Sequence, residues 1–191
     1  MENKKIDLRV KYTKKAIYDS ILNLLDTNSI DKVTVQDICK GAEINRATFY
    51  THYKNLQALL DEIEIEKSQE IIKILSAFFA GDVNFETTIE ATMRCYKNDK
   101  LLCRFEFGDL STGRTIYAKK FAQEQSIYFW LGKGKITRQQ AEYLKTFFNA
   151  GIRELLCQWY LNGFKDDNNV LKKNIVKIFE KCLEGYFSGD E

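Results

Sequence analysis

The chain has 191 residues, 45% of them hydrophobic and 13% aromatic, which is enough for one or two small domains with a hydrophobic core. Its net charge of +2 is uneven: residues 1–54 carry 10 Lys and Arg against 7 Asp and Glu, whereas the remainder carries 19 against 20, so the N-terminal end can attract phosphate groups. The polar residues 1–15 exclude a signal peptide there, and no segment approaches the ~20 apolar residues of a membrane span, so we expect a cytoplasmic protein without membrane contact.

The first predicted element is a helix over residues 11–26. Ile17, Ile21 and Leu25 recur in it at helical spacing and form one apolar face. The polar residues 1–10 before it form either a frayed terminus or an arm that lies along a phosphate backbone. The chain contains no proline, a composition that favours long uninterrupted helices.

Two short helical patterns separated by a tight turn occupy residues 34–53. Thr34 and Asp37 form an approximate capping box for the first, and Asn45 is a good N-cap for the second. Phe49 faces the core in the second helix, which leaves its polar and basic side chains exposed. This layout is that of a helix-turn-helix, whose second helix enters the major groove of DNA.

This stretch resembles the TetR family of transcriptional regulators, and the resemblance covers roughly residues 11–60. It rests on the lead-in Ile-x-x-Val-Thr at 30–34, the turn Ala-x-Ile at 42–44 and the motif Ala-Thr-Phe-Tyr-x-His-Tyr at 47–53. Several features therefore coincide at the expected spacing.

Two positions depart from the family pattern. Glu43 stands where many members have glycine, which predicts strain in the turn because a non-glycine residue with positive φ is uncommon. Leu56 stands where many members have lysine, which removes a frequent phosphate contact that Lys54 can replace.

The resemblance implies an all-α fold of about nine helices. It implies an N-terminal three-helix helix-turn-helix DNA-binding domain, residues 8–68, joined by a long helix to a C-terminal helical ligand-binding and dimerisation domain, residues 69–191. The implied function is a transcriptional regulator, most often a repressor, that binds a palindromic operator in double-stranded DNA as a homodimer and is released by a small-molecule inducer. The motif itself also favours a dimer, because one recognition helix reads only a few base pairs.

Residue roles at the DNA follow from the resemblance and agree with side-chain chemistry. Arginine suits the edge of guanine, glutamine that of adenine, and alanine the thymine methyl group. The predicted base contacts are Gln36, Arg46, Ala47 and Tyr50. The predicted phosphate contacts, which fix register without reading sequence, are Thr34, Thr48, His52, Tyr53 and Lys54.

The rest of the chain is predicted to form one long helix followed by five further segments. Residues 101–107 could be helix or strand by periodicity, and their context favours a helix. Thr137 and Gln140 form a capping box. The predicted segments are 55–81, 84–97, 101–107, 114–131, 137–163 and, from about residue 170, the last one to 187.

Aromatic residues of these segments either fill the core or line a pocket for a small molecule. The resemblance implies the pocket, and the sequence alone leaves both interpretations open. An aromatic lining suits an apolar or flat ligand, including a cationic one. The candidate pocket residues are Arg94, Phe105, Tyr117, Phe121, Trp130 and Phe148.

The last two predicted helices each carry a broad apolar face. This face is either ordinary core or, in part, a four-helix interface with the same pair of helices from a second subunit, which the motif and the family favour. The candidate interface residues are Phe148, Ile152, Leu155, Trp159, Ile175, Ile178, Phe179 and Cys182.

No pattern typical of a catalytic, cofactor or metal site occurs in the sequence. The five cysteines are scattered and include no Cys-x-x-Cys pair, and the single histidine, His52, lies in the recognition helix. A Gly-rich phosphate loop and a nucleophile elbow are absent. We therefore expect no enzyme activity, no cofactor and no metal. The alternative function is an interaction module that acts through a protein partner without binding DNA or a ligand, for which Glu43 and Leu56 leave room.

Overall fold

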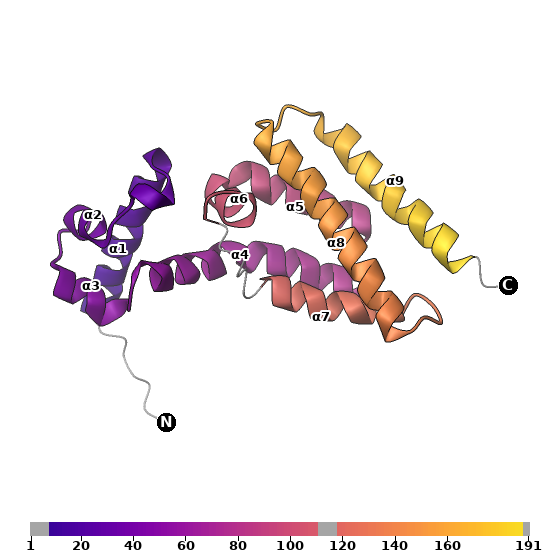
Figure 1. Ribbon diagram of the computed structural model, residues 1–191, viewed down its shortest axis with the longest axis horizontal. Helices are drawn as coiled ribbons and strands as arrows, with labels where there is room; N and C mark the ends of the chain where they lie inside the picture. Colours follow the sequence, from indigo (N-terminus) through magenta and orange to yellow (C-terminus); the bar gives the residue numbers. More distant parts are fainter. Residues whose placement is uncertain (1–7, 111–117, 189–191) are drawn as a thin grey trace, which may run out of the picture. The chain divides into compact units, whose positions relative to one another are not determined.

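The computed structural model describes residues 8–110 and 118–188, the first six residues of the second range by their backbone alone. Every regular element in these ranges is helical, which confirms the predicted all-α fold (Figure 1). The helices are α1 (Leu8–Thr27), the 3-10 turn η1 (Ile30–Lys32), α2 (Val35–Gly41), α3 (Arg46–His52), α4 (Leu56–Ala80), α5 (Phe85–Asn98), α6 (Lys100–Phe107), α7 (Ala118–Leu131), α8 (Arg138–Leu161) and α9 (Asn168–Phe187).

The chain divides into two compact units, Met1–Glu66, here called the head, and Lys67–Glu191, here called the body. The long helix α4 contributes residues to both. The assignment of domains to residues 8–68 and 69–191 stays a prediction.

The head is held together by the packing of α1 against α2. Ile17 and Ile21 of α1 and Ile38 of α2 are fully buried. The buried Ser20 hydroxyl donates a hydrogen bond to the Ile38 carbonyl at 2.9 Å. A Cβ atom on Gly41 would overlap the Ser20 hydroxyl, so any larger residue there would displace this hydroxyl.

The turn between α2 and α3 places a glutamate in a backbone conformation that favours glycine. Glu43 has a φ of 53°, which agrees with the strain predicted at this position. The Ile44 amide donates to the Cys39 carbonyl at 3.0 Å and the Glu43 amide to the Lys40 carbonyl at 3.3 Å. These two bonds form a Schellman motif, whose left-handed position is usually glycine.

The body packs α7 against α8, α5 against α9, and α6 against both α5 and α8. One core cluster surrounds the buried Trp159, and a second includes the buried Trp130, Phe148 and Phe179. Both clusters combine residues of α8 and α9, which lie side by side (Figure 1). The body core is therefore built from helices that are distant in the sequence.

Local capping explains several of the body helix boundaries. Residues 101–107 are helical within α6, because the Asp99 carboxylate accepts hydrogen bonds from the Leu101 and Leu102 amides, each at 3.0 Å. The predicted capping box of Thr137 and Gln140 is present at the start of α8. The predicted start of α7 at residue 114 lies outside the described residues.

Replacing Glu43 by glycine should stabilise the protein by about 1 kcal/mol, because glycine adopts positive φ without the steric penalty of a Cβ atom. Urea unfolding followed by far-UV circular dichroism measures this change. Tryptophan fluorescence would not follow the head, because Trp130 and Trp159 both lie in the body.

The matched control is Glu43→Ala, which removes the same charge but keeps the Cβ atom. If alanine stabilises the protein as much as glycine does, backbone strain at Glu43 is not the cause.

Candidate functional site

The recognition helix α3 is positioned by a cap at its start and an anchor at its centre. The Asn45 carboxamide oxygen accepts hydrogen bonds from the Thr48 amide at 2.7 Å and from the Thr48 hydroxyl at 3.0 Å. Phe49 is fully buried and contacts the ring of Tyr53. With Phe49 turned inward, Arg46, Ala47 and Tyr50 lie exposed on the outer side of the helix.

Arg46 and Tyr50 lie one helical turn apart on this exposed side and contact each other. An Arg46 Nη2 atom donates to the Tyr50 hydroxyl at 3.5 Å, and the guanidinium lies 6.0 Å from the centre of the Tyr50 ring. The hydrogen bond that Arg46 donates to Tyr50 raises the pKa of Arg46, so the group is cationic throughout the physiological range. The pair presents a positive charge and an aromatic edge to any bound molecule.

The start of α2 adds further polar groups to the head. The Thr34 hydroxyl accepts from the Asp37 amide at 3.2 Å, and the Asp37 carboxylate accepts from the Thr34 amide at 3.1 Å, so the predicted capping box is present. Hydrogen bonds from the Thr34 side chain and backbone lower the pKa of Asp37. Gln36 is exposed beside this box. Thr34 therefore supports the helix in addition to any contact that it makes outside the protein.

The predicted phosphate contacts differ in their exposure. Lys54 is exposed, and Thr48 and His52 are partly buried. Tyr53 is only 4% exposed, and its hydroxyl donates to the Glu62 carboxylate at 3.0 Å. Burial and the neighbouring Glu62 carboxylate raise the pKa of Tyr53.

Tyr53 thus belongs to a network inside the head. Glu62 also accepts two hydrogen bonds from the Lys14 ammonium, at 2.8 and 3.0 Å, and this ammonium lies 5.1 Å from the centre of the Tyr53 ring. The network ties α1 and α4 to the end of the recognition helix.

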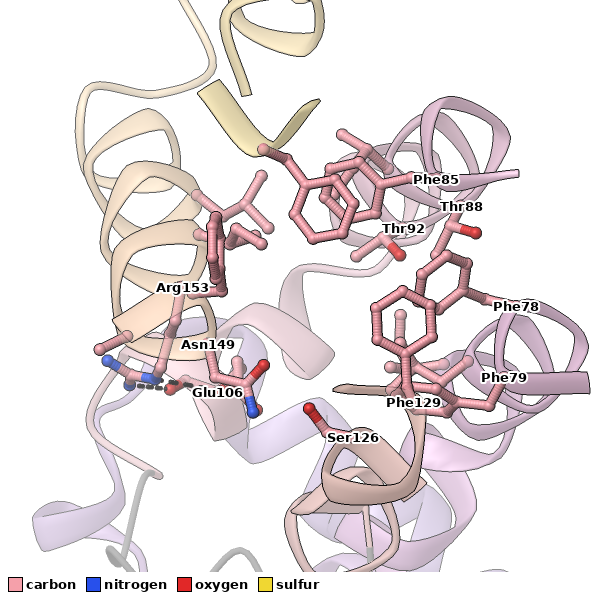
Figure 2. Close-up of a pocket in the computed structure, with 18 of the residues that line it drawn as sticks. Phe78, Phe79, Phe85, Thr88, Thr92, Glu106, Ser126, Phe129, Asn149 and Arg153 are labelled. Carbon is pink, nitrogen blue, oxygen red and sulfur yellow. Dashed lines mark hydrogen bonds and ion pairs between the residues drawn. The ribbon is translucent and has the colours of Figure 1, made fainter. Parts of the chain in front are cut away.

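The body contains a cavity of about 320 Å³. Each of the helices α4 to α9 contributes at least one aromatic side chain to its wall (Figure 2). These aromatic lining residues are Phe78 and Phe79 of α4, Phe85 and Tyr96 of α5, Phe107 of α6, Phe129 and Trp130 of α7, Phe148 of α8 and Phe179 of α9.

Two of the six predicted pocket residues, Trp130 and Phe148, line this cavity. Phe105 is buried elsewhere in the core, and Arg94 lines a separate polar hollow with Lys97 and Lys172. Tyr117 lies outside the described residues, and the side chain of Phe121 does so as well.

Sequence reasoning missed the polar lining of the cavity. The polar side chains there are Thr88, Thr92, Glu106, Ser126, Asn149 and Arg153. One signal was present in the sequence: Thr88 and Thr92 share the buried face of α5 with Ile89, Met93 and Tyr96. Hydroxyl groups on an otherwise apolar helix face indicate either an internal hydrogen bond or a polar ligand.

The predicted interface residues fall into two groups. Phe148, Trp159, Ile175 and Phe179 are buried within the body, and Ile152 is partly buried. Leu155, Ile178 and Cys182 are exposed. Sequence periodicity alone did not separate the two sides of these helices.

Burial disfavours the thiolate form of three cysteines, Cys39, Cys95 and Cys103. Burial raises the pKa of Cys39, and it raises the pKa of Cys103 to about 12. Among the described residues no group of three or more His, Cys, Asp and Glu side chains could hold a metal ion. In the same part of the chain no helix has the length and apolar character needed to cross a membrane.

Comparison with known proteins finds a family match in the head. Residues 9–63 match the family described as "Bacterial regulatory proteins, tetR family". Over 76 residues the chain is 36% identical to the "Uncharacterized HTH-type transcriptional regulator YxbF" of Bacillus subtilis (strain 168). This match covers 39% of the chain and spans only 20% of the length of that relative.

Solved structures resemble the chain over nearly its whole length. A TetR transcriptional regulator from Streptococcus agalactiae 2603V has a TM-score of 0.65 at 23% identity, over 90% of this chain and 96% of that one. The fatty acid degradation regulator FadR from Bacillus halodurans has a TM-score of 0.64 at 15% identity, over 92% and 96% of the two chains. The dihydroxyacetone kinase operon activator DhaS has a TM-score of 0.55 at 17% identity, over 90% and 96%.

At these identities the structures show a shared fold. The family match agrees with the helix-turn-helix geometry of the head. The match to the tetR family thus covers residues 9–63 of the head, and the chain as a whole shares the fold of the solved regulators.

Proposed function

We propose that this protein is a transcriptional repressor that binds a palindromic operator as a homodimer and is released by a small-molecule inducer. The observation that carries the proposal is the exposed side of α3, where Arg46, Ala47 and Tyr50 project from a helix fixed by the buried Phe49. A short helix anchored in this way can insert its N-terminal side chains into the major groove.

The proposed base contacts are those that the chemistry of the exposed residues supports. The Arg46 guanidinium can donate two hydrogen bonds to guanine, and the contact with Tyr50 limits the directions in which it points. Ala47 is small enough to meet a thymine methyl group, and Gln36 can pair with adenine.

The proposed phosphate contacts are Thr34, Thr48, His52 and Lys54. Each is at least partly exposed. For Tyr53 we propose a supporting role instead, because the residue is buried and its hydroxyl already donates to Glu62. Phosphate contacts of this kind set the register of the head and make binding depend on salt.

The proposed dimer interface is the exposed apolar side of α8 and α9. Phe147 is 65% exposed and Ile178 is 51% exposed, and Leu155 and Tyr186 lie exposed on the same two helices. An exposed apolar patch on a helix pair is typical of a surface that binds another protein. A dimer would supply the two heads that a palindromic operator needs.

The proposed inducer site is the body cavity. Helix α4 contributes Leu59 and Ile63 to the core of the head, and Ile71, Leu75 and Phe78 to the cavity wall. A molecule that occupies the cavity can therefore act on the helix that the head shares. It weakens DNA binding only if it has a higher affinity for the body conformation that binds the operator poorly.

Replacing Arg46 by alanine should reduce operator affinity by about 1–3 kcal/mol and abolish the preference for guanine at one position of each half-site. The measurement is selection of bound duplexes from a random pool at two salt concentrations. The matched control is Arg138→Ala, because Arg138 is also an exposed arginine at the first position of a helix but lies in the body.

Direct reading of DNA is supported if the wild type and Arg138→Ala enrich the same palindrome and Arg46→Ala loses its guanine preference at one position of each half-site. If no sequence is enriched even at low salt, direct DNA binding is wrong and the protein acts through a partner protein.

Replacing Tyr53 by phenylalanine should destabilise the protein by about 1 kcal/mol, because it removes a hydrogen bond to a carboxylate. Operator affinity should stay unchanged at conditions where the protein is folded. Urea unfolding and fluorescence anisotropy with a labelled operator measure the two quantities. A loss of operator affinity without a loss of stability would show that Tyr53 contacts a phosphate group, as the sequence predicted.

Replacing Ile178 by glutamate should dissociate the dimer, because it places a charge in the centre of the proposed apolar interface. Sedimentation velocity gives the mass of the assembly. The matched control is Tyr128→Glu, which alters a 66% exposed aromatic residue on α7. A dimer that persists in Ile178→Glu would show that the interface lies elsewhere.

A further inference from the structure

From the lining of the body cavity, we infer that its ligand is an uncharged aromatic molecule of about two rings with a hydrogen-bonding group at one end. This inference rests on the proposed function, in which the cavity is the inducer site. Four features of the cavity carry it: the size, the arrangement of rings, the hydroxyl groups of the lining and the balance of charge.

The size of the cavity limits the ligand. Its volume of about 320 Å³ is roughly twice the ~150 Å³ of an apolar protein cavity that binds benzene. A molecule of two fused or linked rings fills such a space, whereas a single ring leaves much of it empty.

The wall of the cavity presents ring faces and ring edges. The Phe85 and Phe179 rings stack at 3.8 Å between centroids, and the Trp130 and Phe148 rings stack at 5.0 Å. The Phe129 ring lies 5.0 Å from that of Phe78, tilted by 40°. Such a wall favours flat aromatic ligands, because ring pairs gain from offset stacking and edge contacts beyond the burial of area.

The cavity wall includes two hydroxyl groups that are carried by buried residues. Ser126 is 4% exposed and Thr92 is 8% exposed, and both line the cavity. Figure 2 shows the Ser126 oxygen directed across the cavity toward the Asn149 amide group. A hydroxyl group in a largely apolar wall can both donate and accept a hydrogen bond, so these groups favour a ligand with a hydrogen-bonding group at this side.

The charged side chains of the lining neutralise each other. The Arg153 guanidinium donates to the Glu106 carboxylate at 3.2 Å and to the Glu106 carbonyl at 2.6 Å, and lies over the Phe107 ring. A cationic ligand would have to displace Arg153 from this carboxylate, and an anionic ligand would have to displace Glu106. Because an unpaired charge in an apolar site is costly, the cavity favours a neutral ligand over either ion.

The test is equilibrium dialysis of the full-length protein at pH 7 against four probes of similar shape. They are 2-naphthol and 2-methylnaphthalene, which are neutral with and without a hydroxyl group, the anion 2-naphthoate and the cation 2-naphthylmethylammonium. We expect 2-naphthol to bind about tenfold or more tightly than either ion, because each ion must break the Glu106 and Arg153 pair. It should also bind several-fold more tightly than 2-methylnaphthalene. An ion that binds as tightly as 2-naphthol, or failure of all four probes to bind, would overturn the inference.

Variants locate the binding in the cavity. Ser126→Ala and Thr92→Val should each reduce the affinity for 2-naphthol toward that of 2-methylnaphthalene and leave the affinity for 2-methylnaphthalene unchanged. The matched control is Ser68→Ala, which alters a buried serine of α4 that does not line the cavity. If Ser68→Ala lowers 2-naphthol affinity as much as the cavity variants do, the hydroxyl groups of the cavity do not recognise the ligand.

A variant of the Glu106 and Arg153 pair should raise the affinity for an anion. Glu106→Gln leaves Arg153 without its carboxylate, so 2-naphthoate should gain about tenfold or more in affinity. An unchanged affinity for 2-naphthoate would show that the pair does not set the preference for charge.

Operator binding, measured by anisotropy in parallel samples, separates this inference from the proposed function. Binding of 2-naphthol without any effect on operator affinity supports the ligand class and overturns the inducer role. Absence of operator binding overturns the repressor proposal, whereas the dialysis result still decides the ligand class.

Discussion

Burial of Phe49 is the interaction on which the DNA-binding side of this protein depends. The recognition helix Arg46–His52 has seven residues, too few to be stable in water without tertiary packing. Asn45 caps its start, and Phe49 holds it against the head. The same anchor determines which side chains face outward, so one apolar contact sets both the stability of the helix and the direction of its polar face.

The head combines this firm anchor with a turn that is not optimised for stability. Glu43 occupies a left-handed position at which the Schellman motif normally has glycine, and the strain is compensated by the packing of α1 against α2. Selection retains such a residue when the protein stays above the stability that it needs. The acidic side chain also reduces the positive charge of the head near the proposed DNA contacts.

The body shows a related conflict between packing and function. A core built for stability alone would fill its centre with apolar side chains. Here Thr92 and Ser126 face a cavity with aromatic walls, and Glu106 and Arg153 close one side as a neutral pair. Departures of this kind from good packing are expected at a functional site.

The sequence by itself determined where most helices lie and which side chains of the recognition helix are buried or exposed. The hydrophobic period, the caps at Thr34, Asn45 and Thr137, and the turn at 42–44 predict the helices, because each of these signals acts within a few residues of chain. They also predict that Phe49 is buried and Arg46 exposed, since seven residues of α3 present only one side to the core.

Only the tertiary structure decided which sides of the body helices meet. Phe105 and Phe148 look alike in sequence, yet Phe148 lines the cavity and Phe105 does not, and Ile175 is buried whereas Ile178 is exposed on the same helix. The cavity likewise joins residues from α4 to α9 that no local pattern connects. The physical reason is that periodicity marks a helix as apolar on one side, whereas the partner of that side is selected by packing between segments distant in the chain.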